Sequence, residues 1–263
     1  MNWIAFADAC PSLTADAGYI YEGAALRQHW QRLHASDAEP YPARQGVADA
    51  WTAYHAGDFH RAMKLGLAQG VDGYCVAHKA TCVYASLIEE DLHAKLALFD
   101  VVAERCERQQ REQPDNPAGY YWQAYALGRY AQSCSVVKAL AKGMAPKVRA
   151  NLARAIALAP NHADAWLAMG VYHSEIVGAT GPLIASVTYG ARKEDCQAAF
   201  RQAIALNPFD PGAYTEWANA RLRCDGKKAL DEARALYRQA AAMMPADAKE
   251  RLEVERAKHH LEA

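Results

Sequence analysis

The sequence lacks the charge bias and the apolar runs that define several large protein classes. Its 263 residues carry 29 Lys and Arg against 30 Asp and Glu, which gives a formal net charge of −1. A dedicated nucleic-acid binder usually has a clear basic excess, so we expect no nucleic-acid partner. The sequence has no uninterrupted stretch of 18 apolar residues, so we also expect no transmembrane segment.

Common catalytic motifs are missing as well. The sequence contains no G-x-G-x-x-G, no G-x-x-x-x-G-K-[ST], no H-E-x-x-H and no G-x-S-x-G. Histidine pairs such as His29/His34 and His55/His60 stand five positions apart, whereas metal-binding pairs on one helix face usually stand three or four apart. The sequence therefore predicts a protein that is not an enzyme and has no cofactor and no metal site.

Cysteine usage indicates a compartment. The seven cysteines are scattered and form no C-x-x-C, which is typical of reduced cysteines in a cytoplasm rather than of a disulfide framework. Residues 1–10 contain no basic segment followed by a long apolar one, so we expect no signal peptide. We predict a cytoplasmic protein. Residues 7–10 are a poor match to a lipoprotein cleavage box, and a periplasmic location is the alternative if the N-terminus is truncated.

Alanine is the most abundant residue type in the chain. The chain has 57 alanines, and 52% of its residues are hydrophobic. Because alanine is the best intrinsic helix former and a poor strand former, this composition favours an all-α protein with a sizeable core.

The chain also contains an internal repeat. Residues 114–120, 160–166 and 208–214 align without gaps, and each segment starts with proline and ends with an aromatic residue six positions later. Asn116 and Asp210 suit helix N-caps and are followed by prolines, which are tolerated at the first helical position. Such self-similarity indicates a solenoid of helical hairpins.

The repeated segments resemble the tetratricopeptide repeat (TPR) family. In that family a large residue is followed four positions later by a small one in the first helix, and the second helix precedes a closing proline. The resemblance covers about residues 43–248 and implies an all-α, right-handed superhelical solenoid. The residues that carry it are Trp166, Gly170, Cys196, Phe200, Ala203 and Pro208; Tyr214, Ala218, Ala233, Tyr237, Ala240 and Pro245; Tyr120, Ala124, Val148, Leu152, Ala155 and Pro160; and Gly57, Asp58, Phe59 and Ala62.

The repeats are longer than the usual TPR unit. Successive closing prolines are 46, 48 and 37 residues apart, against a period of about 34 in the family. The surplus lies near residues 131–146 and 174–195. We predict an extra short helix in each insert, bounded by Gly143 and Pro146 in the first and by Gly181 and Gly190 in the second.

The inserts also resemble a narrower group, the regulator of microtubule dynamics family and its bacterial TPR relatives. Residues 135–138, 188–190 and 246–253 carry this similarity. This resemblance implies a role in molecular interactions and, for some relatives, association with membranes or lipids. A second similar group is the TPR component of periplasmic substrate transporters, which is usually exported. The predicted organisation is an N-terminal helical cap (1–42), a repeat array (43–248) and a C-terminal capping helix (249–263), all in one cooperative unit.

A basic window is the first candidate site. From Asn116 to Ala163 the chain has no Asp or Glu and six cations. This pattern suits an anionic ligand, but it also suits a solvated face that is balanced by acids on the preceding helix. The six cations are Arg129, Lys138, Lys142, Lys147, Arg149 and Arg154.

A ligand groove is the second candidate. Tyr121 and Tyr125 share one helix face, which either lines a groove or packs between repeats. Asn219 is the one residue that fits the known TPR clamps for C-terminal carboxylates, and no lysine accompanies it, so we predict no such clamp. The predicted ligand-binding set is Tyr121, Tyr125, Arg129, Lys138, Lys142, Lys147, Arg149 and Asn219.

The predicted function follows from the repeat architecture. We expect a non-catalytic scaffold that binds a protein or peptide segment in a concave groove. The alternative is a binder of an amphipathic small molecule or lipid in an apolar groove with a basic rim. The charge-free stretch 176–191 is expected to act as a lid, a plug or a membrane contact.

Overall fold

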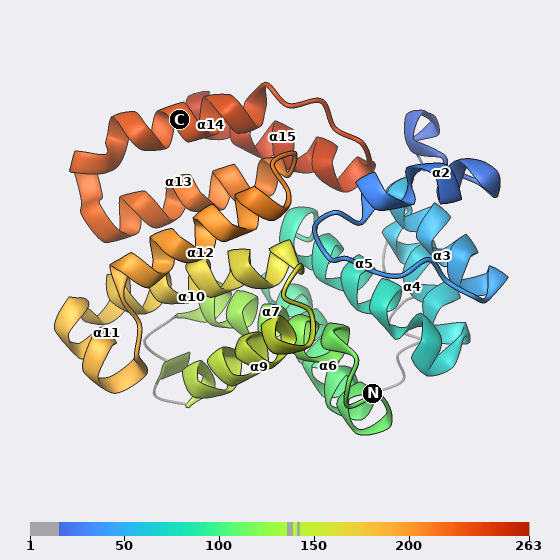
Figure 1. Ribbon diagram of the computed structural model, residues 1–263, viewed down its shortest axis with the longest axis horizontal. Coiled ribbons are helices and arrows are strands. Elements are labelled where there is room, and N and C mark those ends of the chain that lie inside the picture. The colour runs from blue at the N-terminus through green and yellow to red at the C-terminus, as the bar shows by residue number, and fades with distance from the viewer. Residues whose placement is uncertain (1–15, 136–138, 141–142, 263) are drawn as a thin grey trace. The chain divides into compact units, whose positions relative to one another are not determined.

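The computed structural model describes residues 16–135, 139–140 and 143–262, and its regular structure there is entirely helical (Figure 1). This confirms the predicted all-α class and the arrangement as a solenoid of helical hairpins. The chain divides into two compact units. Among the described residues, unit 1 comprises 16–34, 39–133 and 246–249, and unit 2 comprises the remainder.

Unit 1 contains the helices of the first half of the chain. Each helix packs on the next from α3 to α6, and the largest buried side chains include Trp51, Tyr54, Phe59 and Phe99. Gly57 has a positive φ of 88° in the turn between α3 and α4, and Asp58 caps α4, as the sequence predicted for a hairpin turn. The elements are η1 (Ala17–Tyr19), α2 (Ala24–Leu33), α3 (Gln45–His55), α4 (Phe59–Ala68), η2 (Gly70–Gly73), α5 (Tyr74–Leu87), α6 (Leu92–Glu112) and α7 (Pro117–Cys134).

Unit 2 contains two complete hairpins, α10 with α12 and α13 with α14. α10 also packs against α9 and α13. Phe200 is fully buried where α10 and α12 meet, opposite Gly170. The elements are α9 (Met144–Leu158), α10 (Ala163–Thr180), α11 (Pro182–Tyr189), α12 (Lys193–Leu206), α13 (Pro211–Asp225), η3 (Gly226–Ala229), α14 (Leu230–Ala241) and α15 (Ala248–Glu262).

The predicted helix starts are confirmed. The Asn116 side chain accepts a hydrogen bond from the backbone N–H of Ala118 (3.0 Å), and Asp210 accepts one from Gly212 (3.1 Å). These bonds satisfy N–H groups that have no partner within the helix.

The repeated aromatic residues share one hydrogen bond that the sequence did not reveal. Each donates from its polar tip to the carbonyl oxygen of the proline six positions earlier. The distances are 2.9 Å for Tyr120, 2.9 Å for Trp166 and 3.3 Å for Tyr214. The aromatic residue therefore ties the start of one hairpin to the proline that follows the preceding helix.

The second insert forms the predicted short helix, α11, between Gly181 and Gly190, which both have positive φ. Three of its aliphatic side chains are exposed: Leu183 (77%), Ile184 (53%) and Val187 (79%). These three side chains are therefore not part of the buried core of unit 2. Residues 136–138 and 141–142 of the first insert, which include Lys138 and Lys142, lie outside the described residues.

The organisation into 1–42, 43–248 and 249–263 as one cooperative unit remains a prediction, because compactness of two units does not measure cooperativity. Within the part of the chain that the structure describes, no helix is both long and apolar enough to cross a membrane.

Candidate functional site

The repeat register places particular side chains at equivalent positions on successive first helices. Counting from the repeated aromatic residue, Arg129, Glu175 and Arg223 all stand nine positions later. Pro245 precedes α15 as Pro208 precedes α13, so α15 is counted in the same way, with Arg251 at the position of the aromatic residue. We define the first-helix row of unit 2 as the residues that stand five and nine positions after Trp166 on α10, Tyr214 on α13 and Arg251 on α15. These residues are Val171, Glu175, Asn219, Arg223, Arg256 and His260.

An ion pair joins α10 to α13 within this row. Arg223 Nη2 lies 2.9 Å from Glu175 Oε1, and Arg223 Nη1 donates to Ser174 Oγ at 3.2 Å. Both charged side chains are partly exposed. The pair links two adjacent first helices, and its two charges neutralise each other.

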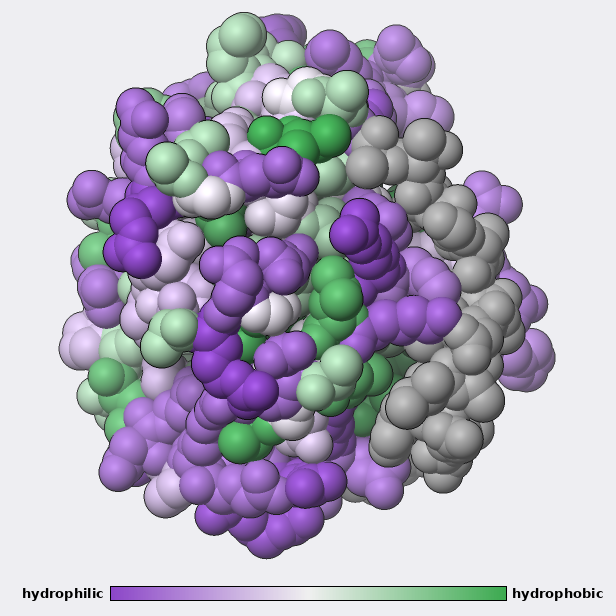
Figure 2. Space-filling view, turned by 90° about the vertical axis from the view of Figure 1, so that its right-hand side faces the viewer, coloured by the Kyte–Doolittle hydropathy of each residue, from purple (hydrophilic) through white to green (hydrophobic). Residues whose placement is uncertain are grey.

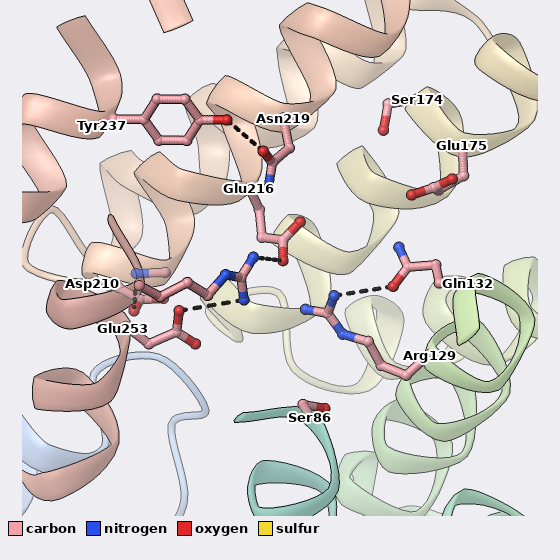
Figure 3. Close-up of polar contacts among 12 residues, drawn as sticks. Ser86, Arg129, Gln132, Ser174, Glu175, Asp210, Glu216, Asn219, Tyr237 and Glu253 are labelled. Atoms are coloured by element: carbon pink, nitrogen blue, oxygen red, sulfur yellow. Dashed lines mark hydrogen bonds and ion pairs between the residues drawn. The ribbon is translucent and has the colours of Figure 1, made fainter. Parts of the chain in front are cut away.

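A second ion pair joins α13 to α15. Arg256 Nη2 donates to Glu216 Oε1 at 2.8 Å, and its other terminal nitrogen lies 3.7 Å from a Glu253 carboxylate oxygen (Figure 3). The Glu216 side chain is only 3% exposed. A buried carboxylate needs a paired cation, so Arg256 is required for the local structure. The guanidinium itself remains 27% exposed.

Asn219 is held by a neighbouring tyrosine. The Tyr237 hydroxyl of α14 donates to Asn219 Oδ1 at 2.5 Å, as Figure 3 shows. Burial raises the pKa of Tyr237, so the hydroxyl stays protonated and remains a donor. With its oxygen engaged by Tyr237, the Asn219 amide keeps Nδ2 as its hydrogen-bond donor.

His260 is the last residue of the first-helix row. Its ring stacks on Tyr237 with centroids 4.8 Å apart and an interplanar angle of 12°. Partial burial and the nearby Arg256 charge lower the pKa of His260, so the imidazole is neutral at pH 7. The row therefore ends in a neutral aromatic surface.

The predicted residues of unit 1 lie together on α7. Arg129 lies over the Tyr125 ring, 5.1 Å from its centroid, and donates to Gln132 at 3.0 Å. The Tyr125 hydroxyl is 3.0 Å from Ser86 Oγ on α5. Tyr121 is only 3% exposed and packs on Trp122 and Tyr125, so it offers packing rather than a contact surface.

The described members of the basic window lie on two different helices. Lys147 and Arg149 are exposed on α9, a second helix, and not on the first-helix row of unit 2. Arg149 lies against Gly190, where an added Cβ would come within 2.7 Å of its guanidinium. The described part of the predicted set thus falls into three groups: Tyr121, Tyr125 and Arg129 on α7, Lys147 and Arg149 on α9, and Asn219 on α13.

Sequence reasoning missed the charged residues of the first-helix row. Glu175, Arg223 and Arg256 were not singled out, although Glu175 and Arg223 both stand nine positions after the repeated aromatic residue. Comparing this offset in every repeat would have found Glu175 and Arg223, but not Arg256, which stands five positions after Arg251.

The described residues on the face shown in Figure 2 form no large hydrophobic patch. The face in Figure 2 is mainly hydrophilic, and its hydrophobic side chains are scattered in small groups. Scattered apolar residues are normal for a protein surface and do not mark a site.

Comparisons with known proteins bear on the fold. No protein-family model matches the sequence, and no curated protein matches it. The chain is similar to the crystal structure of a thermophilic TPR protein of Thermus thermophilus, with a TM-score of 0.55 and 19% sequence identity. The match covers 82% of this chain and 98% of the other. The chain therefore has a TPR-like helical-repeat fold.

Proposed function

We propose that the protein is a non-catalytic scaffold that binds an extended protein segment along the first-helix row of unit 2. The observation that carries the proposal is the Asn219 amide, which Tyr237 fixes with its donor group available. Neighbouring side chains on α10 and α15 extend the polar surface on both sides of Asn219. A TPR-like fold supports this proposal, because repeat arrays typically present such surfaces to protein partners.

The surface suits the main chain of a peptide. An extended segment exposes carbonyl oxygens at regular intervals, and Asn219 Nδ2 can donate to one of them. Replacing such a hydrogen-bond donor by alanine weakens binding by about five- to tenfold.

The charges of the row favour a ligand without a strong net charge. Arg223 is paired with Glu175, and Arg256 is paired with Glu216. Pairs that are already formed give little net attraction to an acidic or a basic ligand. We therefore expect a ligand whose recognition depends on its backbone and on short polar side chains.

The finer sequence predictions remain proposals. Kinship with the regulator of microtubule dynamics family, a cytoplasmic location and an anionic ligand for the α9 cations rest on the sequence alone. Lipid binding in an apolar groove gains no support from α11, since the aliphatic side chains of that helix are exposed.

The test is a selection from a display library of short random peptides on the immobilised full chain. Enriched peptides are synthesised, and their dissociation constants are measured by fluorescence polarisation. We expect Asn219→Ala and Tyr237→Phe each to weaken binding, the first by about five- to tenfold. The tyrosine variant tests whether the fixed amide orientation matters.

The matched control is Gln202→Ala, which removes an exposed side-chain amide from the second helix α12. We expect it to leave the affinity unchanged. The proposal fails if no peptide is enriched, or if enriched peptides bind the Asn219→Ala variant as tightly as the wild-type chain.

A further inference from the structure

Helix α11 presents an apolar ridge on the outside of unit 2, beside α10 at the left of Figure 1. Leu183, Ile184 and Val187 are 77%, 53% and 79% exposed. Residues one and four positions apart fall within about 100° of a helix turn, so these three side chains share one side of α11. Ala185, on the opposite side, is fully buried. We call Leu183, Ile184 and Val187 the α11 ridge.

The helix that carries the ridge is fixed to α10 at its C-terminal end. The Tyr172 hydroxyl on α10 donates to the Tyr189 carbonyl oxygen at 3.2 Å. The Arg192 backbone N–H donates to Nδ1 of the neighbouring His173 at 3.3 Å. A helix that is already formed and held in place loses little conformational freedom when it binds, so the ridge is prepared for a contact.

Two exposed arginines flank the same end of the ridge. The Arg149 guanidinium lies against Gly190, and Arg192 Nε donates to Ser186 Oγ at 3.3 Å. Among the described residues, neither guanidinium forms an ion pair with an acid, whereas the arginines of the first-helix row are paired. The apolar ridge thus has a rim of two cations whose charge is available to an anionic partner.

Helix α11 carries no charge of its own. Residues 176–191 contain no Asp, Glu, Lys, Arg or His. The first acids after them are Glu194 and Asp195 in the first turn of α12, where the helix dipole stabilises carboxylates. Moving the ridge into apolar surroundings therefore desolvates no charged side chain of α11.

We propose that the α11 ridge docks the protein on the surface of an anionic lipid bilayer. The three aliphatic side chains enter the boundary between headgroups and acyl chains, and Arg149 and Arg192 contact lipid phosphates. Because α11 has 8 residues, it is too short to span a bilayer, and the contact stays at the surface. This docking differs from binding a lipid in a groove, and it is independent of the proposed peptide binding.

Area and charge favour a lipid surface over a protein partner. A stable protein–protein interface buries roughly 800 Å² on each partner, and three aliphatic side chains provide only a part of that area. A bilayer needs no complementary shape, and its attraction grows with each apolar side chain and each cation that reaches it. Guanidinium groups also match the geometry of phosphate oxygens.

The test is flotation of the full chain with lipid vesicles of equal parts phosphatidylcholine and phosphatidylglycerol. We expect the wild-type chain to float with these vesicles and to bind vesicles of phosphatidylcholine alone about tenfold more weakly or worse. Leu183→Ser and Val187→Ser should each weaken binding about tenfold, because each removes an aliphatic side chain from the contact. Arg149→Gln and Arg192→Gln should each weaken it about fivefold.

The matched control is Met244→Ser, which removes an apolar side chain that is 87% exposed between α14 and α15, away from the ridge. We expect this variant to float as the wild-type chain does. The proposal is overturned if the wild-type chain stays in solution, or if Leu183→Ser and Val187→Ser float as well as Met244→Ser. It is also overturned if sedimentation velocity shows a dimer that Val187→Ser dissociates while neither chain floats, because a second copy then covers the ridge.

Hydrogen exchange of the wild-type chain makes the test independent of variant folding. Adding the anionic vesicles should slow exchange in residues 182–189 and leave residues 211–225 of α13 unchanged. Protection that is absent from residues 182–189, or that is equal in both segments, would also overturn the proposal.

Discussion

Gly170 and Phe200 offer a quantitative test of the packing between α10 and α12. A Cβ added at Gly170 would lie 2.8 Å from two carbon atoms of the Phe200 ring, which is too close for two carbons. Phe200 is fully buried, and its ring stacks parallel to the Trp217 ring with the ring centroids 6.1 Å apart. The Phe200 ring therefore fits at this position because Gly170 has no side chain.

The expected free energies follow from these contacts. Gly170→Ala should gain about 1 kcal/mol of helix propensity but lose about 1–3 kcal/mol to overpacking, a net loss of about 1 kcal/mol. Phe200→Ala should cost about 3–5 kcal/mol because it leaves a cavity. In the Phe200→Ala background the added methyl enters vacated space, so Gly170→Ala should become stabilising by about 1 kcal/mol.

Urea denaturation of the four chains of this double-mutant cycle measures the coupling. Gly178, also on α10, is the matched control, because a Cβ there would make only an ordinary contact at 3.6 Å. Gly178→Ala should therefore stabilise both backgrounds equally. A coupling energy below about 0.5 kcal/mol between Gly170 and Phe200 would refute the packing argument.

Three other predictions address titration, the repeated hydrogen bond and α11. Burial lowers the pKa of His78 well below 6.5, so the folded state binds fewer protons than the unfolded state. Stability should therefore fall as the pH drops below about 6.5, by up to about 1.4 kcal/mol per pH unit, and urea melts of His78→Gln should show a shallower dependence. Trp166→Phe, which removes the bond to the Pro160 carbonyl, should lower the unfolding free energy by about 0.5–1.5 kcal/mol, and an unchanged urea midpoint would contradict this. Val187→Ser on the exposed face of α11 should change stability by less than about 0.5 kcal/mol, whereas Ala185→Asp on its buried face should cost several kcal/mol; similar melting temperatures for the two variants would show that α11 is oriented differently.

The sequence predicted the helical repeat because its signals are local. Proline after a helix and a capping side chain before the next act within a few residues, and Asn116 and Asp210 do so here. The bounds of α11 were predictable for the same reason, since Gly181 and Gly190 both take positive φ. The exposure of Leu183 and Val187 was not predictable, because apolar residues in a short helix usually pack inward.

The candidate site was predictable only in part. Asn219 could be found from its place in the repeat, but its partner Tyr237 lies on another helix. The pairing of Arg223 with Glu175 depends on how far one helix is shifted along the next, and no local pattern encodes that shift. The basic window was defined by counting residues along the chain, and such a count does not distinguish side chains on α7 from side chains on α9.

The repeat contains positions that keep one contact and positions whose chemistry varies. The aromatic residue occurs three times as Tyr, Trp and Tyr, and each makes the same bond to a proline carbonyl. Nine positions later, the residues are Arg129, Glu175 and Arg223, which differ in charge although they occupy equivalent places. A position that only supported packing would be expected to keep one chemistry, as the aromatic residue does. At this offset the chemistry instead varies so that neighbours match, since Arg223 pairs with Glu175 and gives α10 and α13 complementary charges.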